Sequence, residues 1–218
     1  SHVGSRARNV ALRVKFVSLP IPHNYADGRT MWVKQPEPRS EKAATTGSSP
    51  PDFWAAELGC EADAYWGDWS GYGDVHVFDT QRSVMPSGIY HVQAIDDSCS
   101  TSAEGNYSNP LVINTSKWGD VVGEFYTNPA NCKTEPNGYT DCWSSPNGAT
   151  NFDDISSIVD KFRNLFGAPQ KSRVDIGGDP PAGIIDKLCN FVDISYDVDA
   201  FRGLPYPFTG PPAIDPCP

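Results

Sequence analysis

Two segments near the C-terminal end carry the same pattern of oxygen-bearing side chains. Asn151 stands three residues before Asp154, and Asn190 stands three residues before Asp193, each pair opening an amphipathic stretch. Calcium takes about six to eight oxygen ligands, which a tight loop closed by a carboxylate at a helix start can supply. The same residues also suit an ordinary N-cap with an acidic first turn. The pattern leaves both interpretations open.

The two segments are copies of one sequence. Residues 151–163 match residues 190–202 at nine of thirteen positions with a constant offset of 39, which indicates an internal duplication. Apolar residues at helical spacing predict one helix in each copy, ended by Gly167 and Gly203. Because neither short helix can bury its apolar face alone, we expect the two helices to pack against each other.

This duplicated pattern resembles the dockerin modules of secreted bacterial proteins, especially divergent ones at the C-terminal end of cell-surface proteins, over residues 143–208. The resemblance implies a non-catalytic module for attachment or assembly, stabilised by Ca²⁺. It also implies calcium ligands, which are Ser145, Asn147, the Ala149 carbonyl, Asn151 and Asp154 in the first loop, and Asp186, the Leu188 carbonyl, Asn190 and Asp193 in the second, with Asp175 or Asp179 reaching in across the turn.

Both loops depart from the dockerin pattern at their beginnings. The first ligand position falls on Trp143 in the first loop, where Asp141 is a candidate substitute. In the second loop the first two ligand positions fall on Ala182 and Ile184, which have no oxygen in their side chains. In dockerins that bind cohesins, small polar residues precede the acid that closes each loop. Phe152 and Phe191 stand there in this chain. Docking to a standard cohesin is therefore not expected.

The first half of the chain is typical of a β-rich fold. Val10, Leu12, Val14 and Phe16 alternate with polar residues, which predicts a half-buried antiparallel strand. Gly and Pro make up 39 of the 218 residues, consistent with many turns. The segment from Tyr90 to Thr115 resembles the last two strands of fibronectin type III domains, which implies a binding or spacer module. Strands are predicted at residues 9–19, 30–34, 73–79, 88–95, 110–114 and 121–126.

The predicted fold is mainly β with a small α part. An antiparallel β-sandwich of the fibronectin III or immunoglobulin-like kind occupies residues 1–119. A strand and a disulfide-clamped linker follow at 120–142, and the two-helix dockerin-like module with a Pro-rich tail occupies 143–218.

Six cysteines without a Cys-x-x-Cys motif indicate three disulfides in an oxidising compartment. Fifteen pairings are possible. Proximity favours the set Cys60–Cys99, Cys132–Cys142 and Cys189–Cys217, and six free buried thiols remain the alternative. Since the chain opens at Ser1 without a signal peptide, we expect a mature or excised piece of a secreted or cell-surface protein.

Charge and motifs exclude several functions. A formal net charge of −10 argues against nucleic acid as a partner, and no apolar run is long enough to span a membrane. No catalytic motif is present, and each of the four histidines is more simply placed in a loop, in a strand or near the chain end. Aromatic residues cluster early in the chain and suit either a packed core or stacking on sugar rings; they are Trp54, Tyr65, Trp66, Trp69 and Tyr72.

We therefore expect a non-catalytic, extracellular, calcium-binding structural protein that mediates assembly or anchoring. Its partner is a second copy of itself, as in a cell-surface fibre or layer, or another extracellular protein. Two alternatives remain. The chain is the C-terminal attachment region of a larger secreted hydrolase, or it is a carbohydrate-binding module that uses the tryptophan cluster.

Overall fold

The structure is a computed structural model that describes residues 9–18, 30–45, 52–59, 63–79, 84–135, 138–178 and 185–208. Within these residues, two 3₁₀ turns lie at Glu104–Asn106 and Pro129–Asn131. The strands are β1 (Val10–Ser18), β2 (Thr30–Val33), β3 (Glu37–Arg39), β4 (Phe53–Gly59), β5 (Val75–Phe78), β6 (Ile89–Asp96), β7 (Leu111–Asn114), β8 (Lys133–Thr134) and β9 (Thr140–Asp141), and the helices are α1 (Phe152–Phe162), α2 (Lys171–Val174) and α3 (Phe191–Phe201).

Seven of the strands form one hydrogen-bonded sheet in the order β3-β4-β2-β1-β6-β7, and β5 adds to β4. The pairing is antiparallel throughout except for β4 with β5, which is parallel. The long central pair of β1 and β6 holds Val14 opposite Val92. The strand predicted from Asn9 to Leu19 is confirmed over Val10–Ser18, and Leu19 lies outside the described residues. Its half-buried character is not confirmed, because Ala11 and Arg13 on the second face are also buried.

The strand pairing differs from the two facing sheets expected for a sandwich. β4 pairs with β3 through its first half and with β2 through its second half, so it joins strands that a sandwich would divide. The mainly-β character with a small α part is confirmed. Strands β3 and β4 lie where the sequence predicted only turns or no element, and residues 121–126 carry a single bridge from Phe125 to Trp143 instead of the predicted strand.

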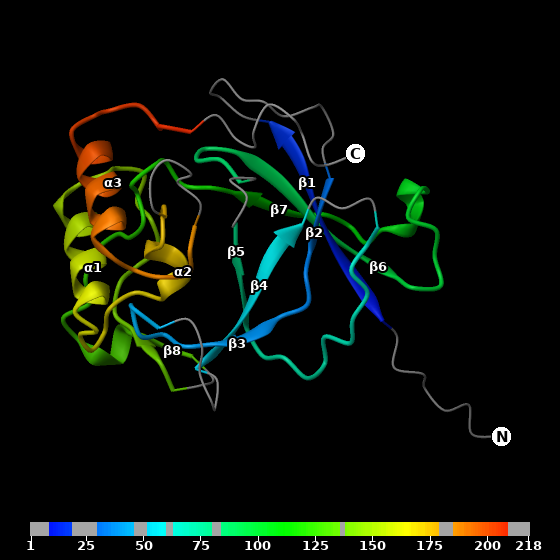
Figure 1. Ribbon diagram of the computed structural model, residues 1–218, viewed down its shortest axis with the longest axis horizontal. Coiled ribbons are helices and arrows are strands. Elements are labelled where there is room, and N and C mark those ends of the chain that lie inside the picture. The colour runs from blue at the N-terminus through cyan, green and yellow to red at the C-terminus, as the bar shows by residue number, and fades with distance from the viewer. Residues whose placement is uncertain are drawn as a thin grey trace.

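Helices α1, α2 and α3 form the helical part of the structure, which lies beside the sheet, at the left in Figure 1. The first turn of α1 meets the last turn of α3, because Phe152 contacts Phe201, and Phe162 at the end of α1 contacts Phe191. The two helices are therefore antiparallel neighbours, as the duplication predicts. Ile158 of α1 is completely buried and packs in one cluster with Val122, Val174 and Cys189.

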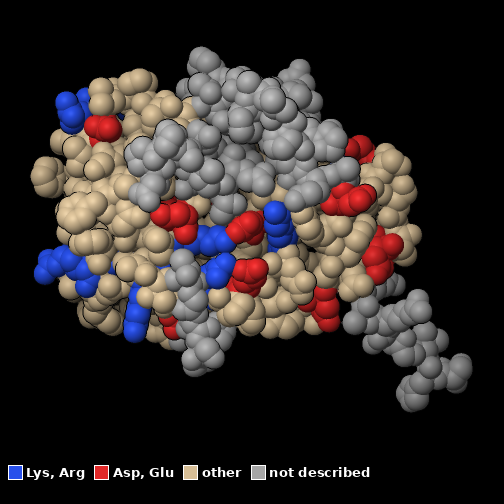
Figure 2. Space-filling model, viewed as in Figure 1, with Lys and Arg blue, Asp and Glu red and all other residues tan. Residues whose placement is uncertain are grey.

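Ion pairs hold the helical part to the sheet. Charged side chains of both signs gather along this boundary in Figure 2. Glu41, which follows β3, accepts a hydrogen bond from the buried Lys161 ammonium of α1. Glu57 of β4 accepts one from Lys187, next to α3. Lys161 and Glu41 are buried, and breaking a buried pair is strongly destabilising, so this pair fixes α1 relative to the sheet, whereas the Lys187 and Glu57 pair is partly exposed.

The disulfide pattern is only partly as predicted. Cys132 and Cys142 are bonded and clamp the hairpin of β8 and β9. Cys99 and Cys189 are free thiols, so the predicted pairs Cys60–Cys99 and Cys189–Cys217 are not formed. Cys60 and Cys217 lie outside the described residues. Burial raises the pKa of the Cys189 thiol to about 12, which makes it unreactive.

Among the residues described above, no helix has the length and apolar character needed to cross a membrane.

Candidate functional site

Each duplicated segment begins with a capping box. The Asn151 side chain accepts a hydrogen bond from the Asp153 amide, and the Asp154 carboxylate accepts one from the Asn151 amide at 2.8 Å. Asn190 and Asp193 do the same at the start of α3, again at 2.8 Å. A capping box satisfies amides that a helix start leaves without partners. The capped-helix interpretation of the sequence pattern is therefore realised in both copies.

Each capping acid also binds a second segment of the chain. Asp154 accepts hydrogen bonds from the amides of Val121 and Val122, at 2.9 and 3.0 Å. Asp193 accepts them from Ile176 and Gly177, at 2.9 and 3.2 Å. Both carboxylates are fully buried. The repeat thus includes two further segments that the structure brings together with the helices, Asp120-Val121-Val122-Gly123 and Asp175-Ile176-Gly177-Gly178.

An insertion in the first copy changes the spacing between the upstream segment and the helix, so the match between the two upstream segments is not found at the offset of the helices. Asp120 precedes Asp154 by 34 residues, whereas Asp175 precedes Asp193 by 18. The first copy contains extra chain that includes the disulfide hairpin of β8 and β9. A comparison of the two copies at the constant offset of 39 does not align the upstream segments, because these are offset by 55 residues. Aligning Asp-Val-Val-Gly with Asp-Ile-Gly-Gly would have identified Asp120.

Asp120 and Asp175 occupy equivalent positions but have different partners. The Asp120 carboxylate accepts hydrogen bonds from the amides of Asn147 and Gly148, at 3.0 and 2.9 Å. Asp175 is only 3% exposed, yet neither of its carboxylate oxygens has a hydrogen-bond partner. The Lys187 amide, which matches that of Gly148, lowers the pKa of Asp175 but does not reach hydrogen-bond geometry.

The charge around Asp175 is uncompensated. Its pKa is raised well above the usual value by burial and then by the negative charges of Asp193 and Asp186. Burial also raises the pKa of Asp193 to about 7, against the opposing effect of its three amide donors. The positive charge of Lys171 lowers the pKa of Asp175, but the Lys171 ammonium donates a hydrogen bond to the Thr45 carbonyl at 2.7 Å. A buried carboxylate in this state requires a cation or a proton.

Asp197 is a second buried acid without a partner. It lies on α3 at the position where α1 has the core residue Ile158, and both of its oxygens lack hydrogen bonds. Burial and the charge of Asp154 raise its pKa to about 8. A Cβ on Gly119 would lie 2.8 Å from an Asp197 oxygen, and Gly119 has φ +75°, so this close approach requires glycine.

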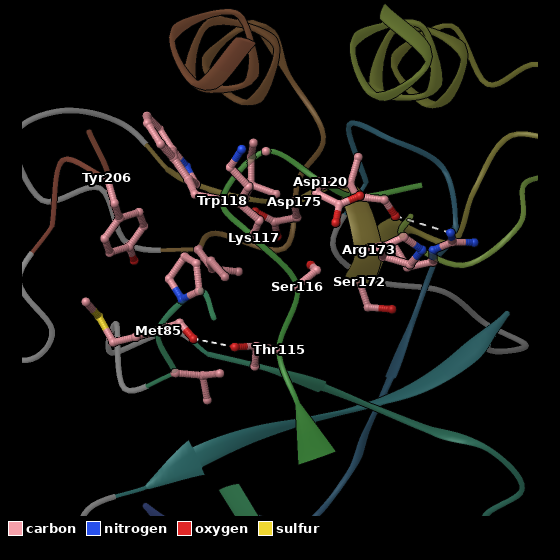
Figure 3. Close-up of a pocket in the computed structure, with 17 residues that line it drawn as sticks. Met85, Thr115, Ser116, Lys117, Trp118, Asp120, Ser172, Arg173, Asp175 and Tyr206 are labelled. Atoms are coloured by element: carbon pink, nitrogen blue, oxygen red, sulfur yellow. Dashed lines mark hydrogen bonds between the residues drawn. The ribbon is translucent and has the colours of Figure 1, made fainter. Parts of the chain in front are cut away.

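A pocket of about 350 Å³ opens between the sheet and the helical part, and Asp120 and Asp175 enter it from the two upstream segments (Figure 3). Trp118 and Tyr206 lie at one side of this pocket, where their rings make an edge-on contact with centroids 5.7 Å apart. Arg173 lies at the other side and hydrogen-bonds to the Val121 carbonyl at 3.2 Å. Both acids are part of the lining of this pocket, although their side chains are buried.

The structure brings only some of the predicted calcium ligands of the first loop close together. Asn147, Ala149 and Asn151 surround the turn before α1, where the Asn147 side chain accepts a hydrogen bond from the Ala149 amide. Ser145 is exposed and precedes this turn. Trp143 is a core residue, and Asp141, the candidate substitute ligand, is ion-paired with Arg173 at 2.7 Å.

The second loop repeats this arrangement. The Asp186 side chain accepts a hydrogen bond from the Leu188 amide, as Asn147 does from Ala149, and contacts the Asn190 amide group at 3.5 Å. Asp175, Asp186 and Asp193 influence one another electrostatically. Asp179, Ala182 and Ile184 lie outside the described residues.

The second loop has a donor set that fits calcium. Within the part of the chain that the structure describes, no three His, Cys, Asp or Glu side chains are already gathered to hold a metal ion. Calcium loops, however, combine a few carboxylates with amide and carbonyl oxygens. Asp175 supplies an orphaned buried carboxylate, and Asp186, Asn190 and the Leu188 carbonyl supply further hard oxygens close by in the chain.

One group of side chains has the composition of a hydrolase triad without its geometry. Ser172 contacts His76 at 3.3 Å, and Glu41 lies 3.8 Å from His76. Both contacts are made at Nδ1 of the same ring. A proton relay needs the nucleophile at one imidazole nitrogen and the acid at the other. This group therefore does not form a relay.

The early aromatic residues divide between the core and a small surface pocket. The Trp69 indole donates to the Val10 carbonyl at 2.8 Å and packs against the main core cluster. Trp66 is 39% exposed and lines a pocket of about 250 Å³ that also contains Gln35, Tyr65 and Asp68. Aromatic faces beside polar groups are the elements of a sugar-binding site as well as of a packed loop.

Comparison of the chain with family models, with curated proteins and with solved structures finds no match.

Proposed function

We propose that this chain is a non-catalytic, calcium-stabilised structural protein of the extracellular space that mediates assembly or anchoring. The observation that carries the proposal is the second loop, in which Asp175 is buried without a partner beside two other acids. Calcium would remove the cost of burying these charges and would bind only the folded chain. The bound ion would supply a fixed positive charge, and Asp175, Asp186, Asn190 and the Leu188 carbonyl would hold it.

The acids of the first loop have hydrogen-bond partners, which supports a single main calcium site in the second loop. Five amides donate to Asp120 and Asp154, which leaves these carboxylates well satisfied without an ion. The two repeats then have separate roles. The first is held together by amide hydrogen bonds, and the second requires the cation.

An exposed apolar surface supports a role in assembly. Phe152 and Phe191 are 69% and 68% exposed, and with Phe162 and Phe201 they form the Phe surface of the two long helices. Exposed apolar patches of this kind mark interaction sites on soluble proteins. The disulfide between Cys132 and Cys142 supports an extracellular location, because such bonds persist in oxidising compartments.

Sedimentation velocity with calcium and with EGTA tests the proposal. We expect concentration-dependent association in calcium that is reduced in EGTA and in a Phe152→Ser, Phe191→Ser double variant. A monomer in both buffers at high concentration, with no binding to extracellular proteins of the same source, would contradict the assembly role.

The pocket beside Trp66 favours one second candidate, contact with a glycan. We expect any glycan binding to be lost in Trp66→Ala. Trp54→Ala is the matched control, because Trp54 contacts Tyr72 edge-on but does not line the pocket in the described residues. Equal binding by both variants would reject this candidate.

A further inference from the structure

The curled sheet carries an apolar cavity that the proposed function does not use. Its volume is about 590 Å³, within the range of about 300–1,000 Å³ typical of small-molecule sites. Side chains from six strands line it. They include Val14 of β1, Leu58 of β4, Val92 of β6 and Ile113 of β7.

Two strands at edges of the sheet form the mouth of this cavity. β5 pairs with β4 and β7 pairs with β6, and both contribute exposed lining residues. At this mouth Val77 of β5 is 44% exposed, and Leu111 and Ile113 of β7 are 62% and 40% exposed. These side chains point along the inner face of the sheet, yet water still reaches them. Among the described residues, core side chains therefore do not fill the inner face completely.

The chemistry of the lining specifies a class of ligand. Most of the described lining residues are aliphatic, and the aromatic ones are Phe78 and Tyr90. This lining lacks the aromatic platform on which sugars or nucleobases stack. Among the described lining residues the charged one is the buried Asp79, and no Lys or Arg is present to pair with a carboxylate.

Two uncharged polar side chains, Thr115 and Ser172, line both this cavity and the pocket of about 350 Å³, so they lie where the two meet. Thr115 donates to the Met85 carbonyl at 2.6 Å, and the Ser172 hydroxyl contacts His76. Aliphatic side chains of all six strands line the rest. An elongated ligand with one small polar group would match this distribution.

We propose that the cavity between β5 and β7 binds a neutral ligand with an aliphatic chain, such as a long-chain alcohol. Burial of each methylene against the lining strengthens binding about fourfold, so a chain of moderate length binds without any ionic contact. The ligand would also cover the exposed apolar side chains at the mouth.

Neighbouring residues of β7 provide a matched pair of variants. Ile113 faces the cavity, whereas Val112, also exposed, does not line it in the described residues and alternates to the other face. The probe is the neutral dye N-phenyl-naphthylamine, displaced by dodecanol or by dodecanoate. Circular dichroism and thermal melts check that each variant is folded.

We expect one dye per chain, displaced by dodecanol more effectively than by dodecanoate. Ile113→Trp should weaken binding about tenfold, the effect of displacing about two methylene groups, while Val112→Trp binds as the wild type does. The inference is overturned if neither neutral compound binds, if both variants bind equally, or if dodecanoate binds as tightly as dodecanol. It is also overturned if only an extended apolar peptide displaces the dye, since the site would then accept an added strand.

Discussion

Replacing Asp175 by Asn should change stability in opposite directions with and without calcium. Asn keeps the shape of the side chain and removes its charge. In EGTA the wild-type chain buries an acid that has no partner and faces Asp186 and Asp193. Asp175→Asn removes this cost, so the variant should be the more stable protein.

In calcium the order should reverse. Extracellular calcium modules bind with a Kd of about 10⁻⁴–10⁻³ M. At about 10 mM calcium, the ion then stabilises the wild type by about 1.4–2.7 kcal/mol through binding the folded state alone. For a chain of this length, this corresponds to a rise in Tm of roughly 3–10 °C. The variant lacks a principal ligand and should show little of this rise.

Thermal melts followed by circular dichroism at neutral pH measure both differences. Magnesium at the same concentration is the control, because Mg²⁺ demands stricter geometry and retains its waters. A variant that is less stable than the wild type by the same amount in both buffers would refute the reasoning. Asp175 would then have a hydrogen-bonding role that does not depend on an ion.

Three further predictions concern neighbouring features. Asp154→Ala should cost about 1–3 kcal/mol equally in calcium and in EGTA, because it leaves three amides without their acceptor, and a loss confined to calcium would contradict the capping role. Asp197 has a folded-state pKa of about 8 against about 3.9 unfolded. The folded state therefore holds a proton that the unfolded state has released, so in EGTA Asp197 lowers the stability between about pH 5 and 8 by at most about 1.4 kcal/mol per pH unit, and Asp175 and Asp193, whose pKa values are also raised, add to this slope. Asp197→Ile should reduce the slope by up to this amount, and an unchanged slope would show that Asp197 does not hold the proton. A double Cys132→Ser, Cys142→Ser variant should lose about 2–3 kcal/mol of its free energy of unfolding, because the bond closes a loop with a sequence separation of 10 and so restricts the unfolded chain. Urea unfolding measures this loss, and an unchanged midpoint would show that the hairpin is stable without its bond.

The sequence predicted the elements that have strong local signals. The alternation at Val10–Phe16 predicted β1, and the Asn and Asp spacing predicted the starts of α1 and α3. Strand β4 was missed because both of its faces are buried, which removes the alternation. The single curled sheet depends on how β4 is shared between β2 and β3, and this pairing is a long-range contact with no local signal.

The candidate site was predicted in part. The capping acids Asp154 and Asp193 follow from their spacing to Asn151 and Asn190. Their second set of donors lies up to 33 residues away in the sequence, so no helix or strand period could indicate them. The sequence signal for Asp120 is the match of Asp-Val-Val-Gly with Asp-Ile-Gly-Gly at an offset of 55, whereas the orphaned state of Asp175 is a property of the fold alone.

Calorimetric titration of the metal-free chain with calcium tests the central claim most directly. We predict saturable binding of one ion per chain to the second repeat, abolished by Asp175→Asn and retained by Asp120→Asn. The absence of saturable heat up to several millimolar calcium, supported by equilibrium dialysis, would contradict the claim that the second repeat holds a cation.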